Sequence, residues 1–260
     1  MNSPSLQPPV LFVSDAHLGG FSNKENERIE SEFIQLINYC DRNEIRLAIL
    51  GDLFDYWMEY PNFVPNIGKN LLDRFEAFNQ KLGPTLFITG NHDNWTLGHL
   101  RKRGFYIEHN EYVFDSGKDK IMTLHGDGLA DPRYELNRPL MHRILRHDYF
   151  IKCYRSLLPP KRGIKLMKYF SRLTRKFDEG AQKVKKLDQW CRQQLKNTDL
   201  DIILCGHDHI PRRKQFAFGT YINLGTFYHH RTMALYNKDG ISLVCWKPEM
   251  QSLNQFETTD

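Results

Sequence analysis

Five short polar motifs follow apolar runs in this chain, and their side chains are of the types that bind metal ions. The motifs are Asp15-Ala16-His17, Gly51-Asp52, Gly90-Asn91-His92-Asp93, His125-Gly126-Asp127 and Gly206-His207-Asp208-His209. Carboxylate, imidazole and amide oxygen donors together suit Mn²⁺, Fe²⁺ or Zn²⁺. Seven such groups exceed the needs of one ion, so we predict two divalent ions that share a bridging carboxylate. The predicted ligands are Asp15, His17, Asp52, Asn91, His125, His207 and His209.

The ordered set of motifs is more specific than any one of them. An isolated Asp-x-His pair or Gly-Asp dipeptide is common in turns, whereas four specified residues after a strand, as in residues 90–93, rarely coincide. Side chains at i and i+2 of an extended segment point to the same side, so Asp15 can act with His17, and His207 with His209. The neighbouring glycines allow sharp turns and a close approach of the backbone.

The elements that precede these motifs predict an α/β fold. Each motif follows four or five residues of Leu, Ile, Val, Phe or Met, which is typical of a strand buried on both faces. Between the first three motifs, residues 26–38 and 71–82 place their apolar side chains at helical spacing. Strands that alternate with helices place the motifs at one sheet edge. The C-terminal region, with a hairpin turn at 237–240, predicts a second, largely antiparallel sheet.

A long interval separates the last two motifs. The 81 residues between His125 and His207 are too many for a structureless loop in a compact domain. Their apolar residues keep a helical period in three stretches, which are separated by residues 159–163 and by Gly180. We therefore predict a helical cap inserted at about 134–197 in a domain of residues 10–260, after a flexible N-terminus of residues 1–9.

Charge is distributed unevenly between this interval and the rest of the chain. Residues 133–196 contain 18 Lys or Arg and 5 Asp or Glu, a net charge of +13, whereas the whole chain carries +5, so the remainder carries −8. A basic segment on an acidic body predicts phosphates, nucleic acid or an anionic membrane as its partner. Dispersed cysteines, no secretory signal pattern and no apolar run of about 20 residues together predict a cytoplasmic protein.

The ordered motifs resemble those of the calcineurin-like metallophosphoesterases over about residues 10–224. The resemblance implies a four-layer αββα sandwich with a dinuclear metal site and an inserted cap. It implies a first ion held by Asp15, His17, Asp52 and His209. It implies a second ion held by Asp52, Asn91, His125 and His207, so that Asp52 bridges the two. His92 is then expected beside the substrate phosphate as a catalytic acid, with Asp93 as the carboxylate that orients it.

The interval and the sequence GDLFDYW resemble the branch of this family that hydrolyses UDP-2,3-diacylglucosamine in the lipid A pathway. This resemblance implies Mn²⁺, a nucleotide-linked acylated sugar as substrate, and cleavage at the α-phosphorus to UMP and 2,3-diacylglucosamine 1-phosphate. It also implies peripheral association with the anionic surface of the inner membrane, which basic helices favour by about 1 kcal/mol per residue. Members of the branch carry arginine where this chain has His92. The cap residues expected to contact the substrate are Arg133, Tyr134, Arg138, Arg162, Ser171 and Lys176.

Other functions fit parts of the pattern. A nuclease or nucleotide phosphodiesterase would carry the same core motifs and a basic segment, and its binding to nucleic acid would weaken steeply with salt; we regard nucleic acid as the less expected partner. A general phosphomonoesterase would not need so long an interval. A non-catalytic scaffold would be expected to have lost ligands, whereas every expected ligand position is filled in this chain.

Overall fold

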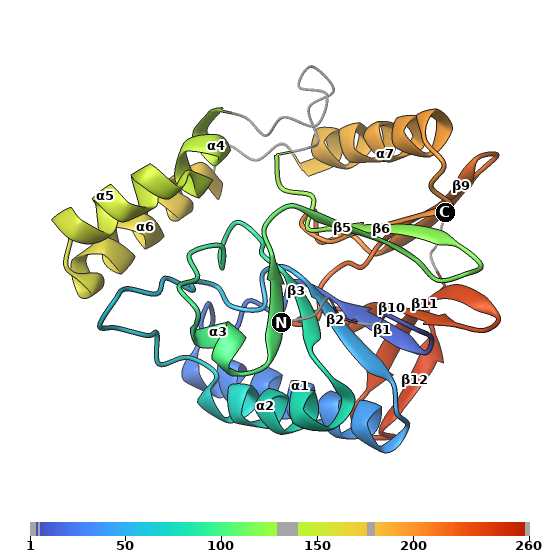
Figure 1. The fold of residues 1–260 in the computed structure, drawn as a ribbon, viewed down its shortest axis with the longest axis horizontal. Coiled ribbons are helices and arrows are strands. Elements are labelled where there is room, and N and C mark those ends of the chain that lie inside the picture. Colours follow the sequence, from blue (N-terminus) through green and yellow to red (C-terminus); the bar gives the residue numbers. More distant parts are fainter. Residues whose placement is uncertain (1–3, 5, 129–139, 176–179, 258–260) are drawn as a thin grey trace.

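Two β-sheets lie face to face, with helices on their outer faces (Figure 1). The computed structural model describes residues 4, 6–128, 140–175 and 180–257. The seven-stranded sheet has the order β12 (Ser252–Gln255), β11 (Gly240–Lys247), β10 (Thr232–Asn237), β1 (Val10–Val13), β2 (Arg46–Leu50), β3 (Thr85–Ile88) and β4 (Phe105–Glu108). The five-stranded sheet has the order β5 (Glu111–Asp115), β6 (Lys120–Leu124), β7 (Ile202–Cys205), β9 (Gly219–Asn223) and β8 (Arg212–Phe216).

The helices predicted between the first motifs lie on the outer face of the seven-stranded sheet. They are α1 (Asn23–Arg42) and α2 (Lys69–Leu82), and a short α3 (His99–Lys102) precedes β4. The Ser22 hydroxyl begins α1 by accepting a hydrogen bond from the backbone N–H of Glu25. Side chains alternate along β1, so that Leu11 packs with the helices and Phe12 packs between the two sheets.

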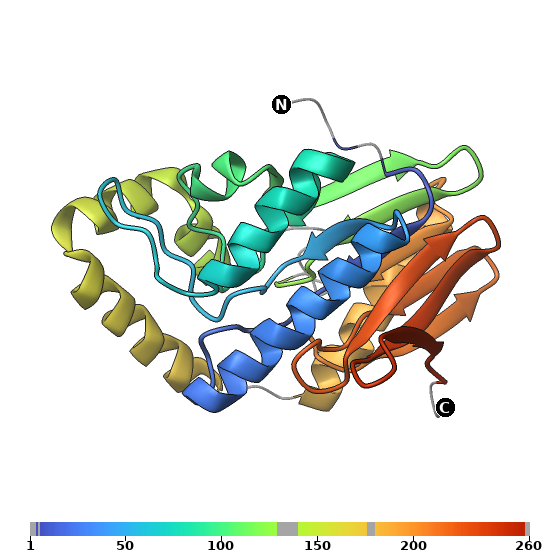
Figure 2. The same cartoon turned by 90° about the horizontal axis from the view of Figure 1, so that it is seen from below.

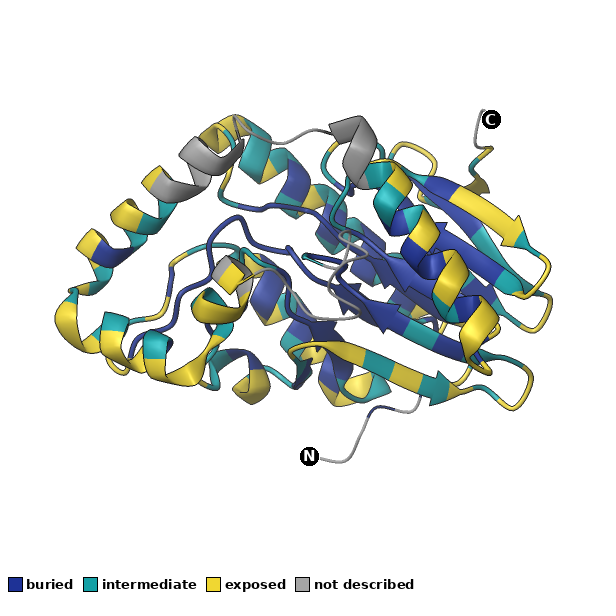
Figure 3. Cartoon of the chain, turned by 90° about the horizontal axis from the view of Figure 1, so that it is seen from above, coloured by how far each residue is buried: buried dark blue, intermediate teal, exposed yellow. Residues whose placement is uncertain are grey.

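The outer face of the five-stranded sheet is covered by α7 (Gly180–Asn197). Leu187, Trp190 and Leu195 of this helix share a buried cluster with Ile203 and Tyr221 of the sheet. The order of layers is therefore helix, sheet, sheet and helix, which confirms the predicted αββα sandwich. Figure 3 shows that the central strands are buried, whereas edge strands such as β5 and β8 are largely exposed or partly exposed.

The sequence led us to expect the C-terminal strands in a second sheet, and only part of this expectation is correct, because β9 lies in the five-stranded sheet whereas β10 and β11 do not. The hairpin at 237–240 is present, but its strands β10 and β11 extend the first sheet, where β10 pairs antiparallel with β1. The second sheet instead has a parallel centre of β6, β7 and β9. Pairing with β1 buries Met233 and Ala234 on the two faces of the larger sheet, which explains why an apolar strand is stable there.

Three further helices lie away from the two sheets (Figure 2). They are α4 (Leu140–Arg146), α5 (Asp148–Leu157) and α6 (Pro160–Arg175). The last two pack on the loops after β2 and β3, through a cluster that includes Tyr60, Trp95, Ile151, Ile164 and Met167. We infer that the cap consists of α4 to α6 and that α7 belongs to the sandwich. Among the helices that the structure describes, none has the length and apolar character needed to cross a membrane.

Candidate metal centre

The five motifs meet at one edge of the sandwich. β1, β2 and β3 run parallel, and β6 runs parallel to β7, so the C-terminal ends of these strands lie together. Each motif begins within three residues of the end of its strand. The sequence positions the ligands in this way because a parallel sheet collects the residues that follow its strands.

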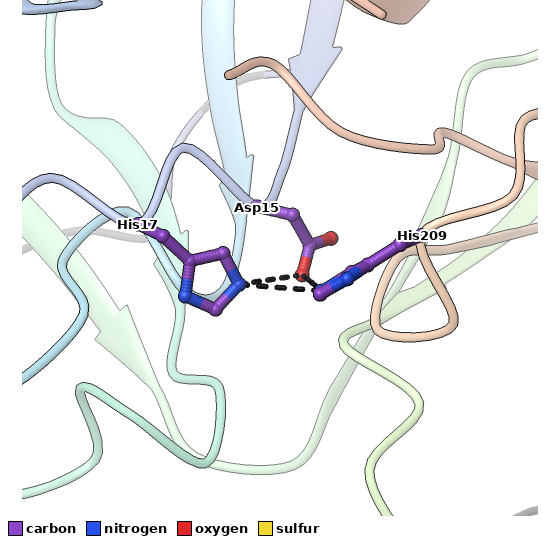
Figure 4. Close-up of side chains that lie close together, drawn as sticks. All are labelled: Asp15, His17 and His209. Carbon is purple, nitrogen blue, oxygen red and sulfur yellow. Dashed lines mark hydrogen bonds and ion pairs between the residues drawn. The ribbon is translucent and has the colours of Figure 1, made fainter. Parts of the chain in front are cut away.

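Asp15, His17 and His209 form a first cluster (Figure 4). Asp15 Oδ1 lies 3.2 Å from His209 Nε2 and 3.6 Å from His17 Nε2. The two imidazole nitrogens are themselves 3.3 Å apart. Asp15 Oδ1 is buried and has no hydrogen-bond partner among the described residues, although a buried carboxylate oxygen normally has one. Two ring nitrogens and this oxygen thus converge on one point.

Asp52, His125 and His207 form a second cluster, and Asp52 joins it to the first. Asp52 Oδ2 lies 3.2 Å from His125 Nε2 and 3.8 Å from His17 Nε2. His125 Nδ1 lies 2.8 Å from the Leu50 carbonyl oxygen, an arrangement that directs Nε2 into the cluster. Asn91 Oδ1 lies 3.3 Å from this Nε2. The structure therefore brings all seven predicted ligands to one place, with Asp52 between the two groups.

Backbone conformation at the centre is unusual. Five of the predicted ligands have φ between 47° and 72°, in the left-handed region that non-glycine residues rarely adopt; they are Asp15, His17, Asp52, His207 and His209. Such conformations persist where the surrounding structure enforces them, often at functional sites. Close packing adds a second constraint, because a methyl group at Gly90 would collide with the Asp52 carboxylate and one at Gly206 with that of Asp15.

The charges of the two clusters stabilise each other. Burial disfavours the charged form of His17, but the neighbouring carboxylates of Asp15 and Asp55 outweigh this effect and raise the pKa of His17 to about 10. Burial also disfavours the charged form of His125, but the negative charge of Asp52 outweighs this effect and raises the pKa of His125 to about 10. Burial opposes the ionisation of Asp52 too, yet the neighbouring histidines, His125 first, hold the pKa of this carboxyl well below its ordinary value.

Asp93 has contacts different from those that we expected. Its carboxylate accepts hydrogen bonds from the backbone N–H groups of Gly90, at 2.7 Å, and Leu53, at 2.9 Å. It therefore ties the loop after β3 to the loop after β2. Complete burial is the main reason why the pKa of Asp93 rises to about 7. These bonds fix the backbone that carries Asn91 and His92.

Asp55 is the residue that contacts the His92 ring. His92 Nδ1 lies 2.6 Å from the Asp55 carbonyl oxygen and 3.6 Å from its carboxylate. The same carboxylate lies 3.5 Å from His17 Nδ1, so one side chain contacts a predicted ligand and the predicted acid together. Sequence reasoning missed this role, although Asp55 lies in the quoted GDLFDYW stretch, three residues after Asp52.

We expect Asp55→Asn to lower kcat/KM about tenfold to hundredfold, because it weakens the orientation of both histidines while keeping the carbonyl oxygen in place. Steady-state kinetics would measure this, with Asp239→Asn, a change in an exposed hairpin turn, as the control. Wild-type kinetics in the Asp55 variant would contradict the orienting role.

The expected cap contacts are described only in small part. Arg133, Tyr134, Arg138 and Lys176 lie outside the described residues, as does the side chain of Ser171. Arg162 lies on the exposed surface of α6. These contacts stay predictions. Among the described cap residues, Lys168 of α6 approaches the His92 side of the centre: its Nζ lies 5.0 Å from the Tyr56 ring, which in turn packs 5.4 Å from the ring of His92.

Comparison with known proteins identifies the family. A model of the calcineurin-like phosphoesterases matches residues 8–211. The chain belongs to this family. As a calcineurin-like phosphoesterase it is a hydrolase, and its family uses divalent metal ions, for which the two clusters offer ligands.

Several known proteins are similar to this calcineurin-like phosphoesterase. A UDP-2,3-diacylglucosamine hydrolase from Vibrio vulnificus (strain YJ016) is 27% identical over 249 residues, which cover 90% of this chain and 96% of the relative. A protein of the same name from Blochmanniella pennsylvanica (strain BPEN) is 34% identical over 151 residues, which cover 55% of this chain and 56% of the relative. The solved structure of Yfce, a phosphoesterase from E. coli, matches with a TM-score of 0.47 and 16% identity, and covers 94% of this chain and 95% of its own.

Proposed function

We propose that the protein is a Mn²⁺-dependent hydrolase that cleaves UDP-2,3-diacylglucosamine at the α-phosphorus, releasing UMP and 2,3-diacylglucosamine 1-phosphate. The observation that carries this proposal is the pair of His/Asp clusters joined by Asp52 at the sheet edge. The relatives support this substrate, since two proteins named UDP-2,3-diacylglucosamine hydrolase match 90% of this chain and 96% of their own length.

The donor set fits two divalent ions. Among the residues that the structure describes, Asp15 Oδ1 has no hydrogen-bond partner, yet it faces two ring nitrogens, as a ligand oxygen would without its ion. Nitrogen and oxygen donors without thiolates suit Mn²⁺, Fe²⁺ or Zn²⁺. The first ion would be held by Asp15, His17, Asp52 and His209. The second would be held by Asp52, Asn91, His125 and His207. When bound, such a pair supplies Lewis acidity to phosphoryl oxygens and lowers the pKa of water.

We propose that His92 protonates the leaving group. Its Nδ1 donates to the Asp55 carbonyl oxygen, so Nε2 is the nitrogen available to the substrate. Burial lowers the pKa of His92 below its ordinary value, so the ring is neutral at pH 7 in the absence of substrate. A bound phosphate would raise that pKa, because an adjacent negative charge favours the imidazolium. The ring can then give its proton to the leaving oxygen.

The cap supplies surfaces that suit an acylated substrate and an anionic membrane. Its helices α4 to α6 expose apolar side chains, among them Leu140, Tyr149, Leu157 and Tyr169. The surrounding interval carries a net charge of +13. We propose that the apolar side chains meet the acyl chains and that the basic ones meet the diphosphate and the inner-membrane surface. The approach of Lys168 to Tyr56, beside His92, supports a path from the cap to the reacting phosphate.

The proposal is tested by following UMP release from UDP-2,3-diacylglucosamine by the metal-depleted protein after reconstitution with Mn²⁺. UDP-N-acetylglucosamine and single-stranded DNA serve as comparison substrates. We expect rapid cleavage of the diacylated substrate alone, and in ¹⁸O-water we expect the label in UMP, which locates attack at the α-phosphorus. Cleavage of DNA or of a simple nucleotide diester without cleavage of the diacylated substrate would favour the phosphodiesterase alternative instead.

A further inference from the structure

Arg146, the last residue of α4, is partly buried at the sheet edge where the clusters lie. Its side chain is 12% exposed, and that of Asp127, with which it pairs, is 0% exposed. The guanidinium makes a bidentate pair with this carboxylate, through Nη2 to Oδ1 at 2.9 Å and Nε to Oδ2 at 3.2 Å. A cap residue is thus bound to the residue that ends the fourth ligand motif, His125-Gly126-Asp127.

The remaining N–H groups of Arg146 bind two residues that directly follow β3 and β4 of the seven-stranded sheet. Nη1 donates to the Thr89 hydroxyl at 3.2 Å and to the His109 carbonyl oxygen at 3.0 Å. Nη2 donates to the Thr89 carbonyl oxygen at 3.1 Å. The five bonds match the five N–H donors of a guanidinium, so every donor is used inside the protein. Arg146 therefore differs from a substrate-binding arginine, which would keep donors for its ligand.

The residues that Arg146 holds lie next to two predicted ligands. Thr89 is two residues before Asn91 at the end of β3, and Asp127 is two residues after His125 at the end of β6. These strands belong to different sheets. Asn91 Oδ1 and His125 Nε2 must nevertheless approach to 3.3 Å at the second cluster. Arg146 bridges the two sheets next to the contact between Asn91 and His125.

We propose that Arg146 is a positioning residue that sets the separation of Asn91 and His125, and thereby couples the cap to the second ion site. This inference rests on the proposed metal centre but not on the proposed substrate. The planar fork of arginine is required, because a lysine ammonium has three donors at one point and cannot reach Asp127, Thr89 and His109 together. Docking of α4 does not depend on Arg146 alone, since Trp95 Nε1 donates to the Leu145 carbonyl oxygen at 3.0 Å.

The test is a Mn²⁺ titration of metal-depleted protein that resolves the two sites, for Arg146→Gln, Arg146→Lys and the control Arg143→Gln. Arg143 lies on the same helix and is exposed. We expect both Arg146 variants to weaken Mn²⁺ binding at the second site about tenfold to hundredfold, with the first site unchanged. The control should bind as the wild type does. Asp127→Asn, which keeps one acceptor, provides a milder variant if Arg146→Gln does not fold, and should weaken the second site in the same direction.

Several outcomes would overturn the inference. They are unchanged binding at both sites, equal weakening of both sites, or full rescue by lysine, which would show that only charge matters. If the wild-type protein bound only one Mn²⁺ ion, both this inference and the proposed two-ion metal centre would be refuted. A wild-type protein that binds two ions but does not cleave UDP-2,3-diacylglucosamine would refute the proposed substrate and leave the Arg146 test standing.

Discussion

Asp52→Asn should lower kcat/KM for Mn²⁺-dependent hydrolysis by at least about 10³-fold while the protein stays folded. Asp52 Oδ2 is the oxygen that lies between the two clusters, near His17 on one side and His125 on the other. An amide in its place removes the negative charge that two cations would share. A loss of about 4 kcal/mol of transition-state stabilisation corresponds to this fall in rate.

The asparagine variant isolates this charge from other roles of the side chain. Asp52 Oδ1 accepts a hydrogen bond from the His92 backbone N–H at 2.9 Å, and an amide oxygen can continue to accept it. The measurements are kcat/KM, bound Mn²⁺ per chain and the far-UV circular dichroism spectrum. Asp55→Asn, three residues along the same loop, is the matched comparison and should lose much less activity. A variant of Asp52 that keeps both ions and activity within tenfold of the wild type would refute the bridging role.

His92→Ala should lower kcat about 10²- to 10³-fold and leave the content of bound Mn²⁺ close to that of the wild type. In the proposed mechanism the imidazole contributes a proton and charge stabilisation, and proton transfer of this kind is worth about 10²- to 10⁴-fold. His92 is not among the predicted ligands, and its Nδ1 is engaged by the Asp55 carbonyl oxygen. Comparing kcat with metal content therefore separates catalysis from ion binding.

Two further substitutions at this position refine the interpretation. His92→Gln keeps a polar side chain that cannot deliver a proton, so it should be nearly as slow as the alanine variant. His92→Arg supplies a permanent positive charge and introduces the residue that members of the UDP-2,3-diacylglucosamine-hydrolysing branch carry at this position. This variant should retain more activity than the alanine or the glutamine variant. If His92→Ala lost its bound Mn²⁺ while the turnover per two bound Mn²⁺ ions stayed normal, His92 would instead be a metal ligand or a residue needed for folding.

The candidate metal centre follows largely from the sequence, because each ligand is within a few residues of an apolar strand. Parallel strands bring their C-terminal ends to one edge, so local patterns suffice to predict which side chains meet there. The αββα layering was expected through the family resemblance, and the helices over 26–38 and 71–82 follow from apolar spacing alone. Spacing of this kind reports burial and secondary structure within a short window.

Contacts between distant segments were decided only by the tertiary structure. Local periodicity does not predict which strand β10 pairs with. β10 pairs with β1, more than 200 residues earlier in the chain, because in this position both faces of β10 are buried. The contact of Asp55 with His17 and His92, and the use of Asp93 to fix two loops, depend on how loops from different strands pack. Arg146 reaches two sheets from one helix, and nothing in its own sequence neighbourhood distinguishes it from the basic residues around it. Side-chain geometry of this kind is determined by the path of the whole chain, so local sequence patterns predict the candidate ligands, whereas only the tertiary structure shows which residues hold them in place.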